Sequence, residues 1–333
     1  MLFDDSPPSS LTGIARLAAQ SPVLEAKSRV RYFEIETRSV LNRTRPGMPF
    51  RWTINPYRGC EFGCKYCYAR YTHEFMGIED PWQFEDQIYA KSDLPAILRE
   101  ELRRTDPAHP IAIGTATDPY QPAEKRFRRT RSILEVFGAG RGRRVSITSK
   151  SDLITRDVDL LEKIAEGNAL SIHITITTLD RELARLLEPR APRPDLRLKA
   201  VRTLADAGIR VGVFPNPILP LITDSERHLD RLASTARDHG ATFFGGGLLF
   251  LMPCAKKVFF PFLAERFPDL LPRYEERFSK SAYLRGEYAG MIRARVHAIR
   301  TRYNLDNGPL EHMPAGVEPL QSSLFDSLNS PFR

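Results

Sequence analysis

Short β-branched and apolar runs alternate with longer amphipathic stretches along the chain from about residue 110. This alternation is typical of repeated βα units around a parallel sheet. Six runs predict strands, at residues 51–55, 111–117, 144–149, 170–177, 209–217 and 241–251. Apolar residues at helical spacing predict helices between most of them, at residues 122–137, 154–166, 194–207 and 224–239.

Six βα units are too few for a closed eight-stranded barrel. We therefore expect an α/β fold, a partial (β/α)6 TIM-like barrel over residues 49–253, whose ligands lie at the carboxyl ends of the strands. A helical C-terminal extension is expected over residues 254–310, followed by a tail at 311–333. Its helices are expected at residues 256–266, 270–280 and 285–302. Residues 1–48 are rich in Ser, Pro and Arg without sustained periodicity, which predicts an irregular N-terminal leader.

The composition, 42% hydrophobic and 27% charged, is that of a soluble globular protein. The chain has no run of about 18 apolar residues that could span a bilayer, so we expect no membrane partner. The first residues, MLFDDSPPSS, lack the basic start and apolar stretch of a secretory signal. We therefore expect a cytoplasmic protein whose four cysteines stay reduced.

The chain is basic, with 49 Lys and Arg against 41 Asp and Glu, a formal charge of +8. Part of the excess is clustered in Lys125, Arg126, Arg128, Arg129, Arg131, Arg141, Arg143 and Arg144. Two interpretations stay open. The cluster fits a nucleic-acid or other polyanionic partner, but the preferred interpretation is a solvated helix face followed by a basic turn.

The strongest local signal is NPYRGCEFGCKYCYAR at residues 55–70, directly after a predicted strand. Cys60, Cys64 and Cys67 have the spacing C-x3-C-x2-C, so three thiolates on one short loop can converge on one metal centre. Thiolates are soft ligands that suit iron-sulfur clusters or zinc. A cubane held by three cysteines leaves one iron open to a substrate or cofactor. Gly59 and Gly63 give the loop the backbone freedom that a tight turn needs.

Zinc is the first alternative, because His73 could complete a Cys3His set. The protein would then be a non-catalytic, zinc-stabilised nucleic-acid-binding module. The separations are looser than those of ordinary zinc modules, and such a site needs no barrel behind it. Buried free cysteines are the second alternative, but three of the four cysteines fall within eight residues.

The cysteine motif followed by this βα series resembles the radical S-adenosylmethionine (radical SAM) superfamily. NPYRGC, CYAR, GTATDPYQPAEK and ILPLITDSE resemble the branch related to spore photoproduct lyase, and the similarity runs from about residue 51 to 252. The resemblance implies a 4Fe-4S cluster whose open iron chelates S-adenosylmethionine. An electron from the cluster then cleaves the cofactor to methionine and a 5′-deoxyadenosyl radical, which abstracts a hydrogen atom. It also implies an electron-donor partner such as flavodoxin or ferredoxin.

The resemblance also suggests cofactor contacts. Tyr66, before the last cysteine, is expected against the adenine. The strand-end residues expected near the methionine or ribose are Thr117, Asp118, Lys150 and Thr175. Lys150 suits the cofactor carboxylate and Asp118 its ammonium. The alternatives are a helix cap for Asp118, a solvent-exposed side chain for Lys150 and a strand former for Thr175.

Further pocket candidates are Glu188, Arg190 and Asn216. Spore photoproduct lyases have a cysteine near the end of the second strand that returns a hydrogen atom to the product radical, whereas this chain has Thr115 in that stretch. Cys254 could replace that cysteine or serve as buried packing. The preferred substrate class is a nucleic-acid or nucleotide-related molecule, and a protein or peptide is the enzymatic alternative.

Overall fold

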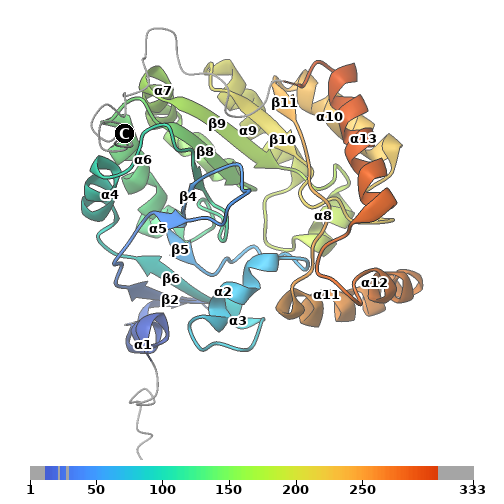
Figure 1. Ribbon diagram of the computed structural model, residues 1–333, viewed down its shortest axis with the longest axis horizontal. Helices are drawn as coiled ribbons and strands as arrows, with labels where there is room; N and C mark the ends of the chain where they lie inside the picture. The colour runs from blue at the N-terminus through green and yellow to red at the C-terminus, as the bar shows by residue number, and fades with distance from the viewer. Residues whose placement is uncertain (1–11, 22, 28–29, 307–333) are drawn as a thin grey trace, which may run out of the picture.

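The computed structural model describes residues 12–21, 23–27 and 30–306. Its main sheet has the strand order β11-β10-β9-β8-β7-β4-β3 (Figure 1). Neighbours from β4 to β11 are parallel and follow chain order, and β3 adds an antiparallel edge. The strands are β3 (Asn42–Arg43), β4 (Trp52–Ile54), β7 (Ile111–Ile113), β8 (Arg144–Ser149), β9 (Ala169–Thr175), β10 (Val211–Phe214) and β11 (Phe243–Phe244). This arrangement confirms the predicted α/β fold of the partial-barrel type.

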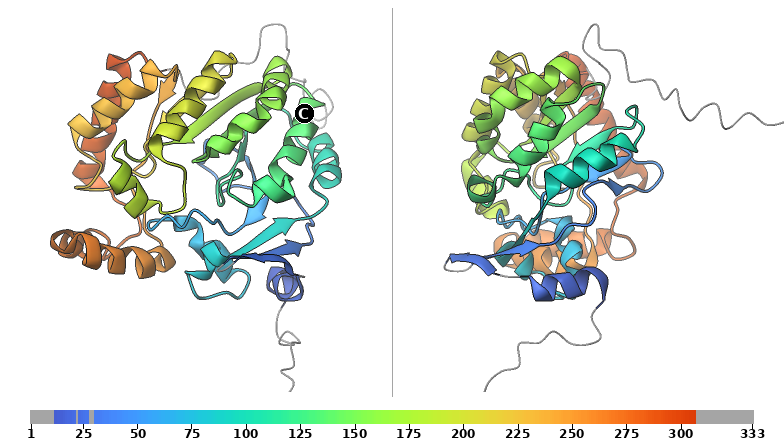
Figure 2. Two further views of the ribbon diagram at one scale, coloured as in Figure 1. Left: turned by 180° about the vertical axis from the view of Figure 1, so that it is seen from behind. Right: turned by 90° about the vertical axis from the view of Figure 1, so that its left-hand side faces the viewer.

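The helices between the strands lie along the outside of this sheet (Figures 1 and 2). They are α4 (Leu94–Arg103), α5 (Glu124–Phe127), α6 (Arg129–Gly138), α7 (Val158–Gly167), α8 (Arg181–Leu187), α9 (Pro194–Asp206) and α10 (Glu226–Asp238), with the 3-10 helix η2 (Asp152–Asp157) before α7. The sequence pattern did not predict α4 or α8. The short helix α8 is capped by Asp180, whose carboxylate accepts the backbone N–H groups of Glu182 and Leu183.

Helices cover the outer face of the main sheet, and its inner face lines the barrel interior. All seven residues of β9 are buried, although the sequence alternates apolar residues with the polar Ser171, His173 and Thr175. The apolar residues Leu170, Ile172 and Ile174 belong to the main hydrophobic core. The predicted strand at residues 241–251 is shorter than expected, because β11 ends at Phe244 and three glycines follow. A Cβ on Gly246 would lie 2.8 Å from the Pro215 side chain, so these glycines permit a close approach of two chain segments.

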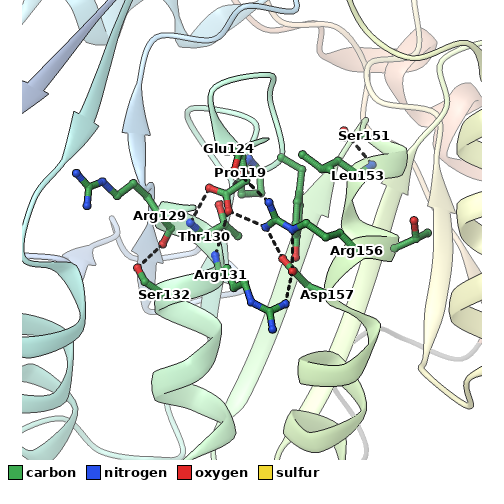
Figure 3. A network of polar contacts seen from close by, with 12 residues as sticks. Pro119, Glu124, Arg129, Thr130, Arg131, Ser132, Ser151, Leu153, Arg156 and Asp157 are labelled. Atoms are coloured by element: carbon green, nitrogen blue, oxygen red, sulfur yellow. Dashed lines mark hydrogen bonds and ion pairs between the residues drawn. The ribbon is translucent and has the colours of Figure 1, made fainter. Parts of the chain in front are cut away.

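The predicted helix at 122–137 is broken at Arg128, which has a left-handed φ of 49°. The break turns the chain around a buried carboxylate, that of Glu124, which accepts the backbone N–H of Thr130 at 2.8 Å (Figure 3). Arg156 forms an ion pair with the same carboxylate at 2.9 Å. Regular helical geometry is therefore lost where the Glu124 carboxylate, rather than a backbone carbonyl, accepts a backbone N–H group.

Part of the predicted basic cluster is used inside the protein. Arg131 forms an ion pair with Asp157 at 2.6 Å and another with Asp159 at 3.0 Å, and the first of these is drawn in Figure 3. Arg129 pairs with Glu34, and Arg143 is buried and donates to backbone carbonyls. The exposed basic surface is correspondingly smaller than the sequence suggests, and a nucleic-acid partner stays a prediction.

The expectation of an irregular leader over residues 1–48 is wrong for its described part. This segment contains α1 (Gly13–Gln20), β1 (Val23–Lys27), β2 (Val30–Ile35) and β3. A second sheet has the order β1-β2-β6-β5, with β5 (Tyr57–Arg58) and β6 (Gln87–Lys91). Strand β2 pairs with β6, which lies about fifty residues further on, so its stability comes from a distant partner that local periodicity does not reveal.

Lys91, in this small sheet, gives a prediction about pH. Its side chain is 7% exposed, and burial together with the nearby Arg58 charge lowers the pKa of Lys91 to about 7. The unfolded chain keeps this proton up to about pH 10.5, so it binds more protons than the folded chain above pH 7. The free energy of unfolding should therefore rise with pH, by up to about 1.4 kcal/mol per unit. Urea unfolding of wild type and Lys91→Met should show the steeper rise in wild type, and parallel pH profiles would contradict this.

The C-terminal helices divide between two places. Helix α11 (Pro253–Arg266), the 3-10 helix η3 (Pro268–Leu270) and α12 (Leu271–Arg277) pack near the cysteine loop, whereas α13 (Gly286–Arg302) packs on α10 (Figure 1). The helices are present as predicted, and the predicted tail at 311–333 lies outside the described residues. Within the described chain, every helix is too short or too polar to cross a lipid bilayer.

Candidate functional site

The cysteine loop follows β5 and ends at the 3-10 helix η1 (Tyr68–Arg70), which continues into α2 (Tyr71–Glu74). Cys60 and Cys64 are buried, Cys67 is partly exposed, and all three are free thiols. Burial raises the pKa of Cys60, and the nearby Asp118, Cys64 and Cys67 raise it further. The three thiols therefore lie close enough to disfavour one another's ionisation, a cost that a bound cation would offset.

The donor set fits an iron-sulfur cluster, because three soft sulfur ligands, two buried and one partly exposed, lie on one loop. In the described part of the chain, no group of three or more His, Cys, Asp and Glu side chains is arranged so that it could hold a metal ion. Ligation of a cluster by Cys60, Cys64 and Cys67 accordingly stays a prediction that rests on their chemistry and spacing.

The start of the loop is fixed by tight backbone contacts at Gly59. Its φ is 80°, and a Cβ there would lie 2.5 Å from the Gln87 carbonyl oxygen. The Gly59 carbonyl accepts the Thr117 hydroxyl at 2.6 Å and the Gln121 amide at 3.0 Å. Gln121 also accepts the Glu61 backbone N–H at 3.0 Å. Thr117, predicted as a cofactor contact, thus holds the cysteine loop.

The outer side of the loop is supported by a network of ion pairs around Glu85. The Arg70 guanidinium donates to the Cys64 carbonyl at 3.1 Å and pairs with Glu85 at 2.8 Å. Arg190 pairs with the same carboxylate at 3.3 Å. A Cβ on Gly63 would lie 2.9 Å from Glu85, so glycine lets the loop approach this network.

Tyr66 lies at the centre of a second charged group, in which Glu188 and Arg197 are fully buried and the Lys150 side chain is 17% exposed. Its hydroxyl donates to Glu188, whose carboxylate also pairs with Arg197 at 2.5 Å and lies 4.0 Å from the Lys150 ammonium. The Lys150 nitrogen is 5.8 Å from the centre of the Tyr66 ring. Burial alone would raise the pKa of Glu188, but the charges of Arg197 and Lys150 outweigh it and the net pKa is lowered. An anionic Glu188 between two cations is the result.

Sequence reasoning did not identify Arg197 and left Glu188 among the secondary candidates. The available signal was position: Arg197 occupies the buried stripe of α9, which also contains Leu198, Val201 and Leu204. An arginine on an apolar helix face needs a buried partner, and that partner is Glu188.

The remaining predicted contacts lie at the carboxyl edge of the sheet. Asp118 accepts the Ser149 hydroxyl at 2.8 Å and the backbone N–H groups of Lys150 at 2.7 Å and Tyr120 at 2.9 Å. Asp118 therefore ties the ends of β7 and β8 together. Thr175 ends β9 and is buried, and its carbonyl accepts Arg197 at 3.0 Å. Cofactor contact by Tyr66, Asp118, Lys150 and Thr175 stays a prediction.

His73, the candidate fourth ligand of a zinc site, belongs to no group of side chains in the described part of the chain that could hold a metal ion. Its Nε2 lies 3.1 Å from the Gln87 carbonyl, its ring packs edge-on against Phe84, and burial lowers the pKa of His73 to about 4. One ring nitrogen is thus already engaged with backbone. Cys254, buried at the start of α11, has a pKa raised to about 11 by burial and by the nearby Glu74, with a small effect of Cys67. The Thr115 carbonyl accepts the Tyr68 hydroxyl.

This architecture, a parallel sheet of the partial-barrel type with a three-cysteine loop at its carboxyl edge, defines the class of protein. The family model described as "Radical SAM superfamily" matches residues 54–233. The chain belongs to the radical SAM superfamily.

Relatives extend over most of the chain. An uncharacterized protein of Mycobacterium tuberculosis (strain ATCC 25618 / H37Rv) is 35% identical over 308 residues, which are 89% of this chain and 88% of that protein. An uncharacterized protein of Methanocaldococcus jannaschii is 30% identical over 200 residues, 60% of this chain and 72% of that protein. A mutant of spore photoproduct lyase has a TM-score of 0.61 at 16% identity, covering 90% of this chain and 86% of that one. This last likeness shows a shared fold.

Proposed function

We propose that the chain is a radical SAM enzyme in which Cys60, Cys64 and Cys67 hold a 4Fe-4S cluster. The observation that supports this most directly is the contact between Tyr66, inside the cysteine loop, and the buried Glu188, Lys150 and Arg197 group. It joins the loop to the carboxyl edge of the sheet, where α/β proteins bind their ligands. When bound, the reduced cluster would supply the electron that cleaves S-adenosylmethionine into methionine and a 5′-deoxyadenosyl radical.

The chain's own residues bind and orient the cofactor. Lys150 offers an ammonium group to the cofactor carboxylate, and its partner Glu188 keeps it charged, since Glu188 and Cys64 outweigh the effect of burial and raise the pKa of Lys150. The other residues proposed to line the cofactor site are Tyr66, Thr117, Asp118 and Thr175. The buried loop and the apolar residues around it exclude water, which protects a reactive radical.

The test is formation of 5′-deoxyadenosine. The full chain is purified without oxygen, reconstituted with iron and sulfide, reduced with dithionite and given S-adenosylmethionine, and the product is measured by mass spectrometry. Wild type should form it and Cys64→Ala should not, because the variant lacks a cluster ligand. Cys254→Ala is the matched control and should keep its iron. Wild-type protein that takes up zinc, holds no iron and forms no product would contradict the proposal and favour the zinc-stabilised binding module.

A further inference from the structure

Two cationic side chains, Arg58 and Lys91, lie on the small sheet that contains β2, β5 and β6 (Figure 1). Lys91 ends β6 and is 7% exposed, and Arg58 ends β5 and is partly buried. The buried Nε of Arg58 has no hydrogen-bond partner among the described residues. The Lys91 ammonium likewise forms no hydrogen bond or ion pair with any described residue. Neither side chain belongs to the proposed cofactor site.

Strand pairing places these two side chains on the same face of the small sheet. Arg58 is directly opposite Tyr89 in the antiparallel pair of β5 and β6, and Lys91 lies two residues further along β6. Successive residues of a strand point to opposite faces, so Arg58, Tyr89 and Lys91 share one face. Diagonal neighbours of this kind are within reach of long side chains. The Arg58 charge accordingly contributes to the lowering of the pKa of Lys91.

The carboxylates nearest this pair of cations are engaged by other groups. Glu101, on α4, is close enough for its charge to act on Lys91, but the two side chains form no ion pair. Its oxygens accept the Ser39 hydroxyl at 2.6 Å and the backbone N–H groups of the next two residues at 3.0 and 2.8 Å. Glu34, on β2, pairs with Arg129. Within the described chain, no carboxylate therefore balances the two cations.

Burying a charge without a partner is costly, and a second like charge beside it adds to the cost. Polar groups in this condition are rare in folded proteins and indicate a bound water or ion. A water molecule would accept hydrogen bonds from the two groups but would leave the repulsion between them in place. An anion offsets the repulsion and the loss of hydration together. The pair of cations therefore points to an anion.

We propose that Arg58 and Lys91 bind a small tetrahedral oxyanion of the phosphate class. A guanidinium group matches two oxygens of such an ion, and an ammonium group supplies a point charge. Thr37 adds a buried hydroxyl without a partner among the described residues, two positions beyond Ile35, which pairs with Lys91. Because Lys91 is so little exposed, the site favours a free ion over a phosphate ester. The bound ion would link β5 to β6 directly before Gly59, where the cysteine loop begins.

The test is isothermal titration calorimetry of the reconstituted full chain with inorganic phosphate, at an ionic strength held constant with sodium chloride. Wild type should bind one phosphate ion. Lys91→Met removes the charge and keeps the length of the side chain, and it should raise the Kd about 10- to 100-fold, the usual contribution of hydrogen bonds to a charged group. Arg58→Gln should raise the Kd by a similar factor. Lys163→Met makes the same change at an exposed position on α7 and should alter the Kd by no more than about 2-fold.

Glycerol 3-phosphate distinguishes a free ion from a phosphate ester, and it should bind wild type more weakly than inorganic phosphate does. Binding as tight as that of phosphate would overturn the assignment to a free ion. Absence of phosphate binding by wild type would overturn the proposal, as would equal Kd values for folded Lys91→Met and Lys163→Met, with folding established by circular dichroism. These results do not depend on the formation of 5′-deoxyadenosine, so failure of this proposal and failure of the proposed function are distinguishable.

Discussion

Gly59→Ala should leave the protein almost without iron after reconstitution. A Cβ at this position would lie 2.5 Å from the Gln87 carbonyl oxygen and 2.8 Å from that of Phe84. Both atoms belong to backbone, and neither can turn aside as a flexible side chain would. The Phe84 carbonyl already accepts the Cys60 N–H at 2.9 Å, so the clash displaces the first cysteine directly. A displaced Cys60 cannot complete a three-cysteine set, which is why cluster binding should fail.

Gly208→Ala is the matched control for backbone strain. Gly208 also has a positive φ, 71°, but nothing lies within 4 Å of a Cβ there. The Gly208→Ala substitution should cost about 1–2 kcal/mol of stability through the left-handed backbone alone. The variant protein should bind iron as wild type does. Iron and acid-labile sulfide per chain are the measurements, with far-ultraviolet circular dichroism to establish folding. Equal iron in folded Gly59→Ala and Gly208→Ala would show that the close approach at Gly59 does not position the cysteines.

The parts of the fold that sequence predicted are those specified by local pattern. The run LSIHITIT at residues 170–177 alternates apolar and polar residues, which is the local pattern of a strand with one face in the core. Its apolar residues, Leu170, Ile172, Ile174 and Ile176, do pack in the main core. The cysteine spacing is equally local, since three ligands on one loop need no distant partner to be recognised. Both signals lie within a few consecutive residues.

The parts that sequence did not predict depend on pairing across the chain. The burial of β2 depends on β6, and the charge of Glu188 depends on Arg197 and Lys150, which lie on α9 and after β8. Composition shows that basic residues are in excess, but it does not show which of them form ion pairs inside the protein. Arg131 is one that does, because it pairs with Asp157 and Asp159. A charge in the sequence becomes a surface charge only when the fold leaves it without a partner.

Glu188→Gln should lower the free energy of unfolding of the cluster-free protein by about 3–5 kcal/mol, the usual cost of removing one partner of a buried ion pair. The change keeps the size of the side chain and an acceptor for the Tyr66 hydroxyl. It removes the only negative charge that the fully buried Arg197 pairs with in the described chain, at 2.5 Å, and the one that faces Lys150 at 4.0 Å. The buried Arg197 and the largely buried Lys150 would then lose the carboxylate that both of them face.

Glu182→Gln, on α8, is the control, because Glu182 pairs with Arg185 at 3.6 Å with both side chains more than 70% exposed. Its cost should stay under about 1 kcal/mol. The pKa of Glu188 is lowered from its ordinary 4.5, so its contribution to stability is complete above pH 4.5 and is lost as the carboxylate gains a proton at lower pH. Urea unfolding should therefore show that the difference in stability between wild type and Glu188→Gln becomes smaller as the pH falls below 4.5. A pH-independent gap for Glu188→Gln would mean that shape, rather than the charge between Arg197 and Lys150, accounts for the stabilisation.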